Sequence, residues 1–225
     1  MLSFDAVLFD FAGTLSAPRT ATDQLRIAAP HLGEVEIASL ASRLTAAGLP
    51  GGPYPTTMPD HAAESYAARD VDEATHRLAY TTLIETVVAP DLARSIYDLV
   101  RIPAGWVVYA DAFATLEQLR QLGVRLGVVT NVGYDLLPVA EGLGLRQRLD
   151  AWTSSAVVGA AKPDPRIFEV ALASLGVAAE RCLMVGDNPE ADAGGVALGL
   201  TTILLPMSHP GAHHGLGTVV RAAGA

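Results

Sequence analysis

The sequence predicts an α/β fold: a doubly wound parallel sheet with a helical domain inserted into it. Two observations predict this class. From residue 111 onward, short apolar runs that end in polar or glycine residues alternate with helical patterns. Between the first apolar run and this alternating part, residues 16–105 show only helical spacing. Alternating strands and helices form a parallel sheet with helices on both faces.

The elements of the sheet domain follow one another in a regular order. The first strand covers residues 6–9 and ends at Asp10. Four further strands are predicted at residues 125–130, 152–158, 182–185 and 201–205. The predicted helices of this part are 111–122, 135–143, 165–175 and 190–198. Gly123 and Gly176 follow two of these helices, as glycine often does at a helix C terminus.

The inserted region is predicted to be helical and without strands. Apolar residues recur at helical spacing within residues 37–44, 74–84 and 92–100, and a loop rich in proline and glycine covers 49–55. We therefore predict a core of residues 1–15 and 106–225 and a helical insertion of residues 16–105. The last of these helical patterns forms an apolar stripe, which consists of Leu92, Ile96, Leu99 and Val100. We interpret this stripe either as the interior of the inserted region or as a homodimer surface.

Composition and charge disfavour several classes of function. The formal net charge is −9 and the pI is about 5.0, which disfavours a nucleic-acid partner because binding to phosphates needs a basic face. No run of about 18 apolar residues occurs, so we expect no membrane span. The only cysteine, Cys182, cannot form an internal disulfide, which fits a cytoplasmic protein. Lys162 is the only lysine, so chemistry that needs a side-chain amine must use it.

Polar side chains gather where the predicted strands end. They are Asp10 after the first strand, Thr130 and Asn131 after the second, Lys162 after the third, and Asp187 with Asp192 after the fourth. Ligands of open α/β sheets bind outside the carboxyl ends of the strands, so we expect these groups to meet. Carboxylates can hold Mg²⁺, and a carboxylate can also attack phosphorus. Taken singly, Asp10 could be a turn former, Asp187 a helix cap and Lys162 a solvated charge.

Four segments resemble the motifs of a known family. Residues 7–15 (VLFDFAGTL), 128–131 (VVTN), 162–168 (KPDPRIF) and 185–192 (VGDNPEAD) resemble, in this order, the four motifs of the haloacid dehalogenase superfamily. The helical insertion between the first two motifs resembles the C1-type cap of the family's subfamily I. The resemblance thus implies that residues 16–105 are a helical cap that closes over the site. The resemblance extends over nearly the whole chain, and it implies a hydrolase with a Rossmann-like core.

The resemblance implies how a substrate would be bound and attacked. Asp10 would be the nucleophile, and Lys162 would neutralise charge between this nucleophile and the phosphoryl group. Thr130 would bind the transferring group with Asn131 beside it, and Thr14 is also expected to contact the substrate. The implied partner is a small phosphorylated metabolite.

The resemblance also implies a magnesium site. The expected ligands are the carboxylates of Asp10, Asp187 and Asp192 and the backbone carbonyl of Ala12. Asp192 is expected in addition to orient Lys162 or metal-bound water.

Ala12 departs from the phosphatase pattern of the family. Phosphatases of the family usually carry a second aspartate at this position, where it acts as general acid and base. The loss of a general acid typically slows a reaction by roughly 10²–10⁴-fold. Three explanations stay open: a phosphatase with a good leaving group or a borrowed acid, a haloacid-dehalogenase-type C–X hydrolase, and an attenuated binding or regulatory protein. The candidate donors are His61, Tyr134, Asp135, His209, His213 and His214.

Two relatives of the family fit this sequence less well. Phosphonoacetaldehyde hydrolases also have alanine at the position of Ala12, but they need a cap lysine, and residues 16–105 contain none. Haloacid dehalogenases are metal-free and usually lack an acidic residue at the position of Asp187. We therefore predict a Mg²⁺-dependent phosphatase that acts through an aspartyl-phosphate at Asp10. The cluster of His209, His213 and His214 is interpreted as a polar C-terminal loop.

Overall fold

The computed structural model describes residues 3–224, and its contacts divide the chain into two compact units. Unit 1 contains residues up to 17, 108–131 and those from 143 onward, and unit 2 contains residues 18–107 and 132–142. Residues 1, 2 and 225 of the predicted core lie outside the described residues. The core of residues 1–15 and 106–225 and the cap of residues 16–105 stay predictions. Residues 132–142, placed in the core by the sequence, group with unit 2 by contacts.

Unit 1 is built on a five-stranded parallel sheet, which confirms the predicted fold class. The strand order is β5-β4-β1-β6-β7. The strands are β1 (Ala6–Phe9), β4 (Arg125–Thr130), β5 (Ala151–Ser154), β6 (Cys182–Gly186) and β7 (Thr201–Leu204). β1 lies at the centre, because it is a continuous apolar run that is fully buried on both faces.

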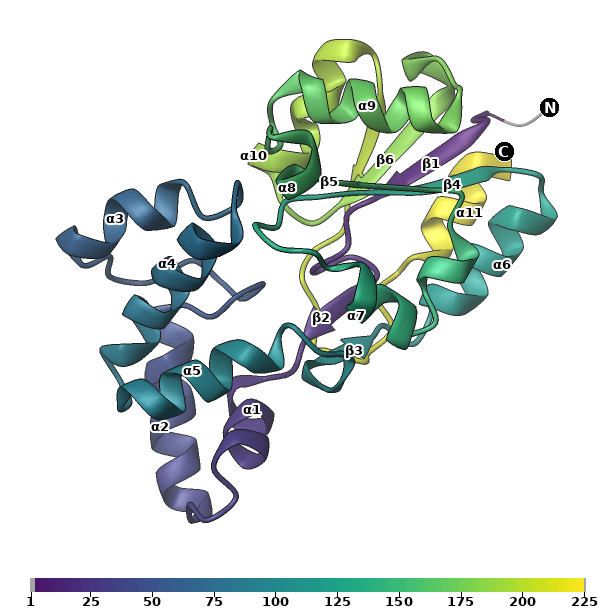
Figure 1. Cartoon of the computed structure of the whole chain (residues 1–225). Helices are drawn as coiled ribbons and strands as arrows, with labels where there is room; N and C mark the ends of the chain where they lie inside the picture. Colours follow the sequence, from purple (N-terminus) through teal and green to yellow (C-terminus); the bar gives the residue numbers. More distant parts are fainter. Residues whose placement is uncertain (1–2, 225) are drawn as a thin grey trace. The chain divides into compact units, whose positions relative to one another are not determined.

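Helices cover both faces of this sheet (Figure 1). The structure has α6 (Ala112–Gln121) and α11 (Gly217–Gly224) on one face and α9 (Pro165–Leu175) on the other. The shorter helices of unit 1 are α8 (Ser155–Val158), α10 (Pro189–Asp192), η2 (Arg146–Arg148), η3 (Ala179–Arg181) and η4 (Ala193–Leu198). Helix α9 begins where Asp164 accepts a hydrogen bond from the Arg166 amide and ends at Gly176, whose φ is 64°.

Unit 2 is mainly helical. It contains α1 (Ala21–Ala28), α2 (Glu34–Ala47), α3 (Asp60–Ala67), α4 (Glu73–Glu85), α5 (Pro90–Leu99), η1 (Pro103–Gly105) and α7 (Leu137–Gly142). Its helices bury an apolar core of their own, which includes Leu25, Leu44, Leu83 and Ile96. The predicted apolar stripe on α5 lies in the interior: Leu92 packs against this core, and Leu99 and Val100 are buried. The stripe is therefore not a dimer surface.

The structure corrects the sequence prediction at a few places. Residues 16–18, which were predicted to be part of a strand-free insertion, form β2 (Ser16–Pro18), and β2 pairs with β3 (Trp106–Val108). A three-residue strand is too short to show an alternating pattern. The predicted strand 152–158 ends at Ser154, since residues 155–158 turn into α8 before Gly159 at φ 71°. No helix within residues 3–224 is both long and apolar enough to cross a membrane.

Candidate active site

Two aspartates follow the neighbouring central strands at the carboxyl edge of the sheet. Phe9 of β1 is paired with Val185 of β6, so Asp10 and Asp187 leave the sheet side by side. The Asp10 amide donates a hydrogen bond to the Val185 carbonyl oxygen at 2.8 Å, which holds Asp10 at the strand end. The Asp10 side chain is buried except for about a tenth of its surface. The expected meeting of Asp10 and Asp187 follows directly from the parallel pairing.

Lys162 lies between two carboxylates. Its Nζ donates hydrogen bonds to Asp10 Oδ1 at 2.9 Å and to Asp192 Oδ1 at 2.6 Å, and all three side chains are buried. Burial disfavours the charged ammonium, but the two carboxylates outweigh it and raise the pKa of Lys162 above its ordinary value. Lys162 is therefore a fixed positive charge beside Asp10.

Asn131 holds the backbone of Lys162. Its Nδ2 donates a hydrogen bond to the Lys162 carbonyl oxygen at 2.8 Å, and its Oδ1 accepts one from the Lys162 amide at 2.7 Å. This reciprocal pair links the end of β4 to the loop that carries the ammonium. Both polar atoms of the Asn131 side chain are thus engaged by protein, and its predicted contact with a transferring group stays a prediction.

Asp192 is fixed by the loop after β6. Its Oδ2 accepts a hydrogen bond from the Asn188 amide at 2.9 Å, and the Asn188 side chain in turn accepts from the amides of Glu190 and Ala191. A Cβ atom on Gly186 would lie only 2.0 Å from Asp192 Oδ2, so this position requires glycine. The loop therefore orients Asp192 toward Lys162.

The turn after Asp10, residues 11–16, packs against Asp187. The carbonyl oxygen of Phe11 accepts hydrogen bonds from the amides of Leu15 and Ser16, and Gly13 donates to the Ser16 carbonyl oxygen at 2.8 Å. Gly13 has φ of 89°, and a Cβ atom there would meet Asp187 Oδ2 at 2.4 Å. Glycine thus allows both the turn and the close approach of the carboxylate.

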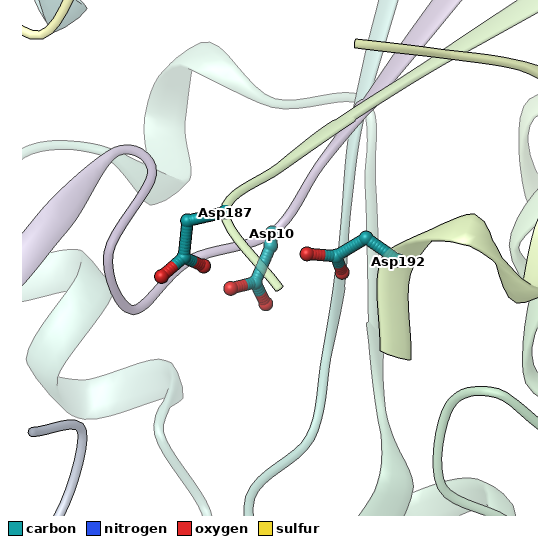
Figure 2. A group of neighbouring side chains, drawn as sticks. All are labelled: Asp10, Asp187 and Asp192. Atoms are coloured by element: carbon teal, nitrogen blue, oxygen red, sulfur yellow. The ribbon is translucent and has the colours of Figure 1, made fainter. Parts of the chain in front are cut away.

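The carboxylates of Asp10, Asp187 and Asp192 lie close enough together to bind one metal ion. Oxygens of Asp10, Asp187 and Asp192 lie within 4.8 Å of one another, and Figure 2 shows the three side chains converging. Burial, together with the charges of Asp10 and Asp192, raises the pKa of Asp187 to about 7. Burial and the charge of Asp192 likewise raise the pKa of Asp10, although Lys162 opposes this.

The donor set fits a hard divalent cation. Among residues 3–224, no other residue donates a hydrogen bond to the Asp187 carboxylate or forms an ion pair with it. Three carboxylates share one ammonium, which leaves excess negative charge in a mostly buried place. Oxygen ligands with uncompensated charge are what Mg²⁺ binds in proteins. Ala12 lies in the adjoining turn and contributes no ionisable side chain.

The two predicted threonines are also buried in this part of unit 1. Thr130 is the last residue of β4 and is paired with Ser154 of β5. Thr14 is fully buried in the turn after Asp10, and its Oγ1 has no hydrogen-bond partner in the described part of the chain. A buried hydroxyl without a partner marks a place where a ligand or water could bind.

The candidate proton donors lie in different surroundings. His61 is exposed on α3, and Tyr134 donates its hydroxyl proton to the Val100 carbonyl oxygen within unit 2. Asp135 accepts a hydrogen bond from the Leu137 amide. His209 and His213 are exposed, but His214 is buried in unit 1. The three C-terminal histidines therefore do not form one cluster.

Sequence reasoning missed the residues that surround His214. Tyr109 stacks on the His214 ring with centroids 4.2 Å apart, and Asp111 accepts hydrogen bonds from the amides of His214, Gly215 and Leu216. These partners are about a hundred residues apart in the chain, and no local pattern links them.

The chain was compared with known proteins. Residues 4–198 match the sequence profile of a hydrolase family described as haloacid dehalogenase-like hydrolase. A phosphoserine phosphatase of Thermus thermophilus is 37% identical over 124 residues, which are 54% of this chain and 50% of that protein. A phosphatase of Mycobacterium tuberculosis is 30% identical over 214 residues, which are 92% of this chain and 89% of that protein. The matches to the first curated relatives span about half of their length or less.

Solved structures share the fold. A crystal structure of a dehalogenase in an intermediate complex has a TM-score of 0.71 at 19% identity, with 100% of this chain and 99% of that chain covered. A phosphatase from Thermococcus onnurineus has a TM-score of 0.59 at 23% identity, with 96% of each chain covered. At these identities the likeness concerns the fold alone.

Proposed function

The chain belongs to the haloacid dehalogenase-like hydrolase family, and we propose that it is a Mg²⁺-dependent phosphatase of small phosphorylated metabolites with Asp10 as its nucleophile. The observation that carries the proposal is the group of three buried or half-buried carboxylates with a single ammonium. A metal-free dehalogenase would not need the unpaired carboxylate of Asp187. The names of the relatives, phosphatases among them, support the same choice.

The contacts of Asp10 indicate which of its oxygens attacks phosphorus. Lys162 holds Oδ1 of Asp10, so we assign the attack on phosphorus to Oδ2. A bond forms from Oδ2 to phosphorus as the bond to the leaving oxygen breaks, and the electron pair stays on that oxygen. Water then attacks phosphorus as the bond from phosphorus to Oδ2 breaks; the electron pair returns to the Asp10 carboxylate, and the protons of the water pass to the released phosphate or to solvent. When bound by Asp10, Asp187 and Asp192, Mg²⁺ would supply charge stabilisation to the phosphoryl oxygens.

Ala12 limits which substrates react well. It offers no proton to the leaving oxygen. We therefore propose substrates whose leaving group departs readily as an anion, or which bring their own donor. Thr14 and Thr130, both buried near the turn and the strand end, are proposed phosphoryl contacts. Asn131 is proposed to position Lys162.

Substitution of Asp10 tests the nucleophile. The Asp10→Asn variant should lose at least about 10⁴-fold in kcat on an aryl phosphate, and it should give no phosphorylated Asp10 peptide after acid quench. Asp5→Asn is the matched control, because Asp5 precedes the other end of β1 and pairs with Arg181. Retained turnover in Asp10→Asn would contradict the assignment. Halide release without metal would favour the dehalogenase, and no turnover by the wild type would favour a binding protein.

A leaving-group series tests the role of Ala12. For the wild type, kcat should fall steeply from 4-nitrophenyl phosphate to alkyl phosphates, because no donor protonates the leaving oxygen. The Ala12→Asp variant should raise the alkyl phosphate rate by about 10²-fold and flatten the series. Ala12→Asn has the same size but no acidic proton, and it should leave the series steep. A flat series in the wild type would mean that another group already donates the proton.

A further inference from the structure

We infer that His214 is a positioning residue for the turn that follows Asp10, and this inference deepens the proposed function. The residues concerned all belong to unit 1. We use the name histidine cluster for His214 together with Tyr109, Asp111 and Ser208. The imidazole of His214 is buried and contacts the other residues of the cluster, and its Nε2 has no hydrogen-bond partner within residues 3–224.

The protein fixes the His214 ring in place. The ring stacks on Tyr109 with an interplanar angle of 9°, and Nδ1 lies 2.8 Å from Ser208 Oγ. The His214 amide donates to Asp111 Oδ1 at 2.9 Å, and the Tyr109 hydroxyl donates to the Ser208 carbonyl oxygen at 3.3 Å. Two contacts hold the imidazole itself, and the other two fix the backbone of His214 and the position of Tyr109, which leaves the ring little freedom to rotate.

One direct hydrogen bond links the histidine cluster to the turn after Asp10. The Tyr109 amide donates a hydrogen bond to the Leu15 carbonyl oxygen at 3.2 Å. The imidazole of His214 lies close enough to the Gly13 backbone for that backbone to favour its protonated form. Nε2 is buried and makes no hydrogen bond of normal length and angle within residues 3–224. A buried ring nitrogen next to a backbone segment is suited to bind that segment.

The position of Gly13 connects this contact to the site. On one side Gly13 is so close to Asp187 that a Cβ atom would meet its carboxylate at 2.4–2.9 Å. Two residues further along the same turn, the Leu15 carbonyl oxygen accepts a hydrogen bond from the amide of Tyr109, whose ring stacks on His214. The turn thus lies between a proposed metal ligand and a rigidly held imidazole. A change at His214 should therefore shift Gly13, and with it Ala12 and Asp187, whose placement determines the metal geometry.

A neutral ring suits this positioning role. Burial lowers the pKa of His214, although Asp111 and the Gly13 backbone oppose the effect. A neutral imidazole carries one proton, so Ser208 can donate to Nδ1 while Nε2–H faces a backbone oxygen. The ring then acts as a fixed spacer between the C-terminal segment and the turn.

Three substitutions test the role of His214 with His209→Ala as the matched control, since His209 is an exposed histidine of the same segment. His214→Ala should lower kcat about 10-fold and raise the dissociation constant for Mn²⁺ about 10-fold, with substrate KM changed less than twofold. Gln can place an amide near the Nε2 position and Asn near Nδ1. His214→Gln should therefore recover more of the metal affinity than His214→Asn.

Amide hydrogen exchange supplies a readout that needs no turnover. In His214→Ala and in His214→Asn, the peptide with the Gly13, Leu15 and Ser16 amides should exchange faster, while the α9 peptide should not change. Unchanged exchange in the turn and unchanged Mn²⁺ affinity would overturn the inference, as would an equal increase over all of unit 1. If the wild type turns over no phosphoester but exchange and Mn²⁺ affinity respond as expected, the positioning role stands and the phosphatase proposal fails.

Discussion

In unit 2 the imidazole of His76 packs among the rings of Tyr80, Tyr97 and Tyr134, whereas in unit 1 three carboxylates share one ammonium. Both clusters are buried and polar. His76 accepts or donates one hydrogen bond with the Tyr97 hydroxyl at 2.8 Å, and burial together with nearby arginines lowers its pKa to about 3. The histidine therefore remains neutral at physiological pH.

The arginines of unit 2 are compensated as well. The Arg69 guanidinium lies 4.0 Å from the centroid of Tyr66, and Arg101 forms an ion pair with Glu73. In unit 1 the negative charge of the three carboxylates is not fully compensated, since Asp187 has no ion-pair partner in the described residues. Buried charge that the protein leaves uncompensated is typical of functional sites, and neutral or paired groups are typical of structural clusters. By this criterion the carboxylate cluster of unit 1 is a functional site, and the cluster around His76 in unit 2 is part of the core.

Among the variants that compare the two units, removal of Lys162 should have the largest effect. The Lys162→Met variant leaves Asp10 and Asp192 without their ammonium. We expect kcat to fall by about 10³-fold and the free energy of unfolding to fall by roughly 3–5 kcal/mol. Steady-state kinetics and urea titration measure the two. The double variant Lys162→Met/Asp192→Asn should regain stability without regaining activity, and if it regained activity the ammonium would be structural only.

Removal of the Asn131 side chain should have an intermediate effect. Asn131→Ala loses both hydrogen bonds to the Lys162 backbone, and we expect kcat to fall about 10-fold through misplacement of the ammonium. Tyr97→Phe is the comparison in unit 2, because it deletes the buried hydrogen bond to His76. It should lower the free energy of unfolding by about 1 kcal/mol and leave kcat unchanged. Equal loss of kcat in the two variants would remove the distinction between the units.

The pH dependence of unit 2 should appear in stability and not in kcat. Since the pKa of His76 is about 3 in the folded chain and about 6.5 when unfolded, the unfolded chain binds an extra proton between these values. The free energy of unfolding should therefore decrease as the pH falls from 6.5, by up to about 1.4 kcal/mol per pH unit. A Trp152→Phe background leaves Trp106 as the tryptophan that reports on unit 2. The His76→Gln variant should lack this contribution to the slope of unfolding free energy against pH. Identical slopes for His76→Gln and for the chain with His76 would refute the prediction.

Much of the site could be predicted because it depends on strand ends. The alternation of strands and helices predicts a parallel sheet, and a parallel sheet brings the residues after its strands to one edge. For this reason the sequence predicts that Asp10, Asp187 and Lys162 meet, and in the structure Lys162 bonds Asp10 and Asp187 lies beside them. The expected roles of individual residues came from the resemblance to the family and stay proposals.

The remaining features depend on contacts that no local pattern records. Asn131 meets the backbone of Lys162 across 31 residues, and His214 meets Asp111 across 103 residues. Residues 132–142 group with unit 2, where Gly133 packs against the backbone of Arg69 and Tyr134 donates a hydrogen bond to the Val100 carbonyl oxygen. Such pairings follow from the three-dimensional path of the chain, so periodicity and motif spacing do not indicate them.

Lys162 is the single lysine of the 225 residues and is almost fully buried between Asp10 and Asp192. Growth on ¹⁵N-lysine would therefore label one ammonium in the whole chain. Its hydrogens are shielded from solvent and hydrogen-bonded to both carboxylates, which should slow their exchange with water enough for a single NMR cross-peak to be observed. The chemical shift of that peak would follow every change in the charge of Asp10, whether it arises from metal, from phosphorylation or from substitution.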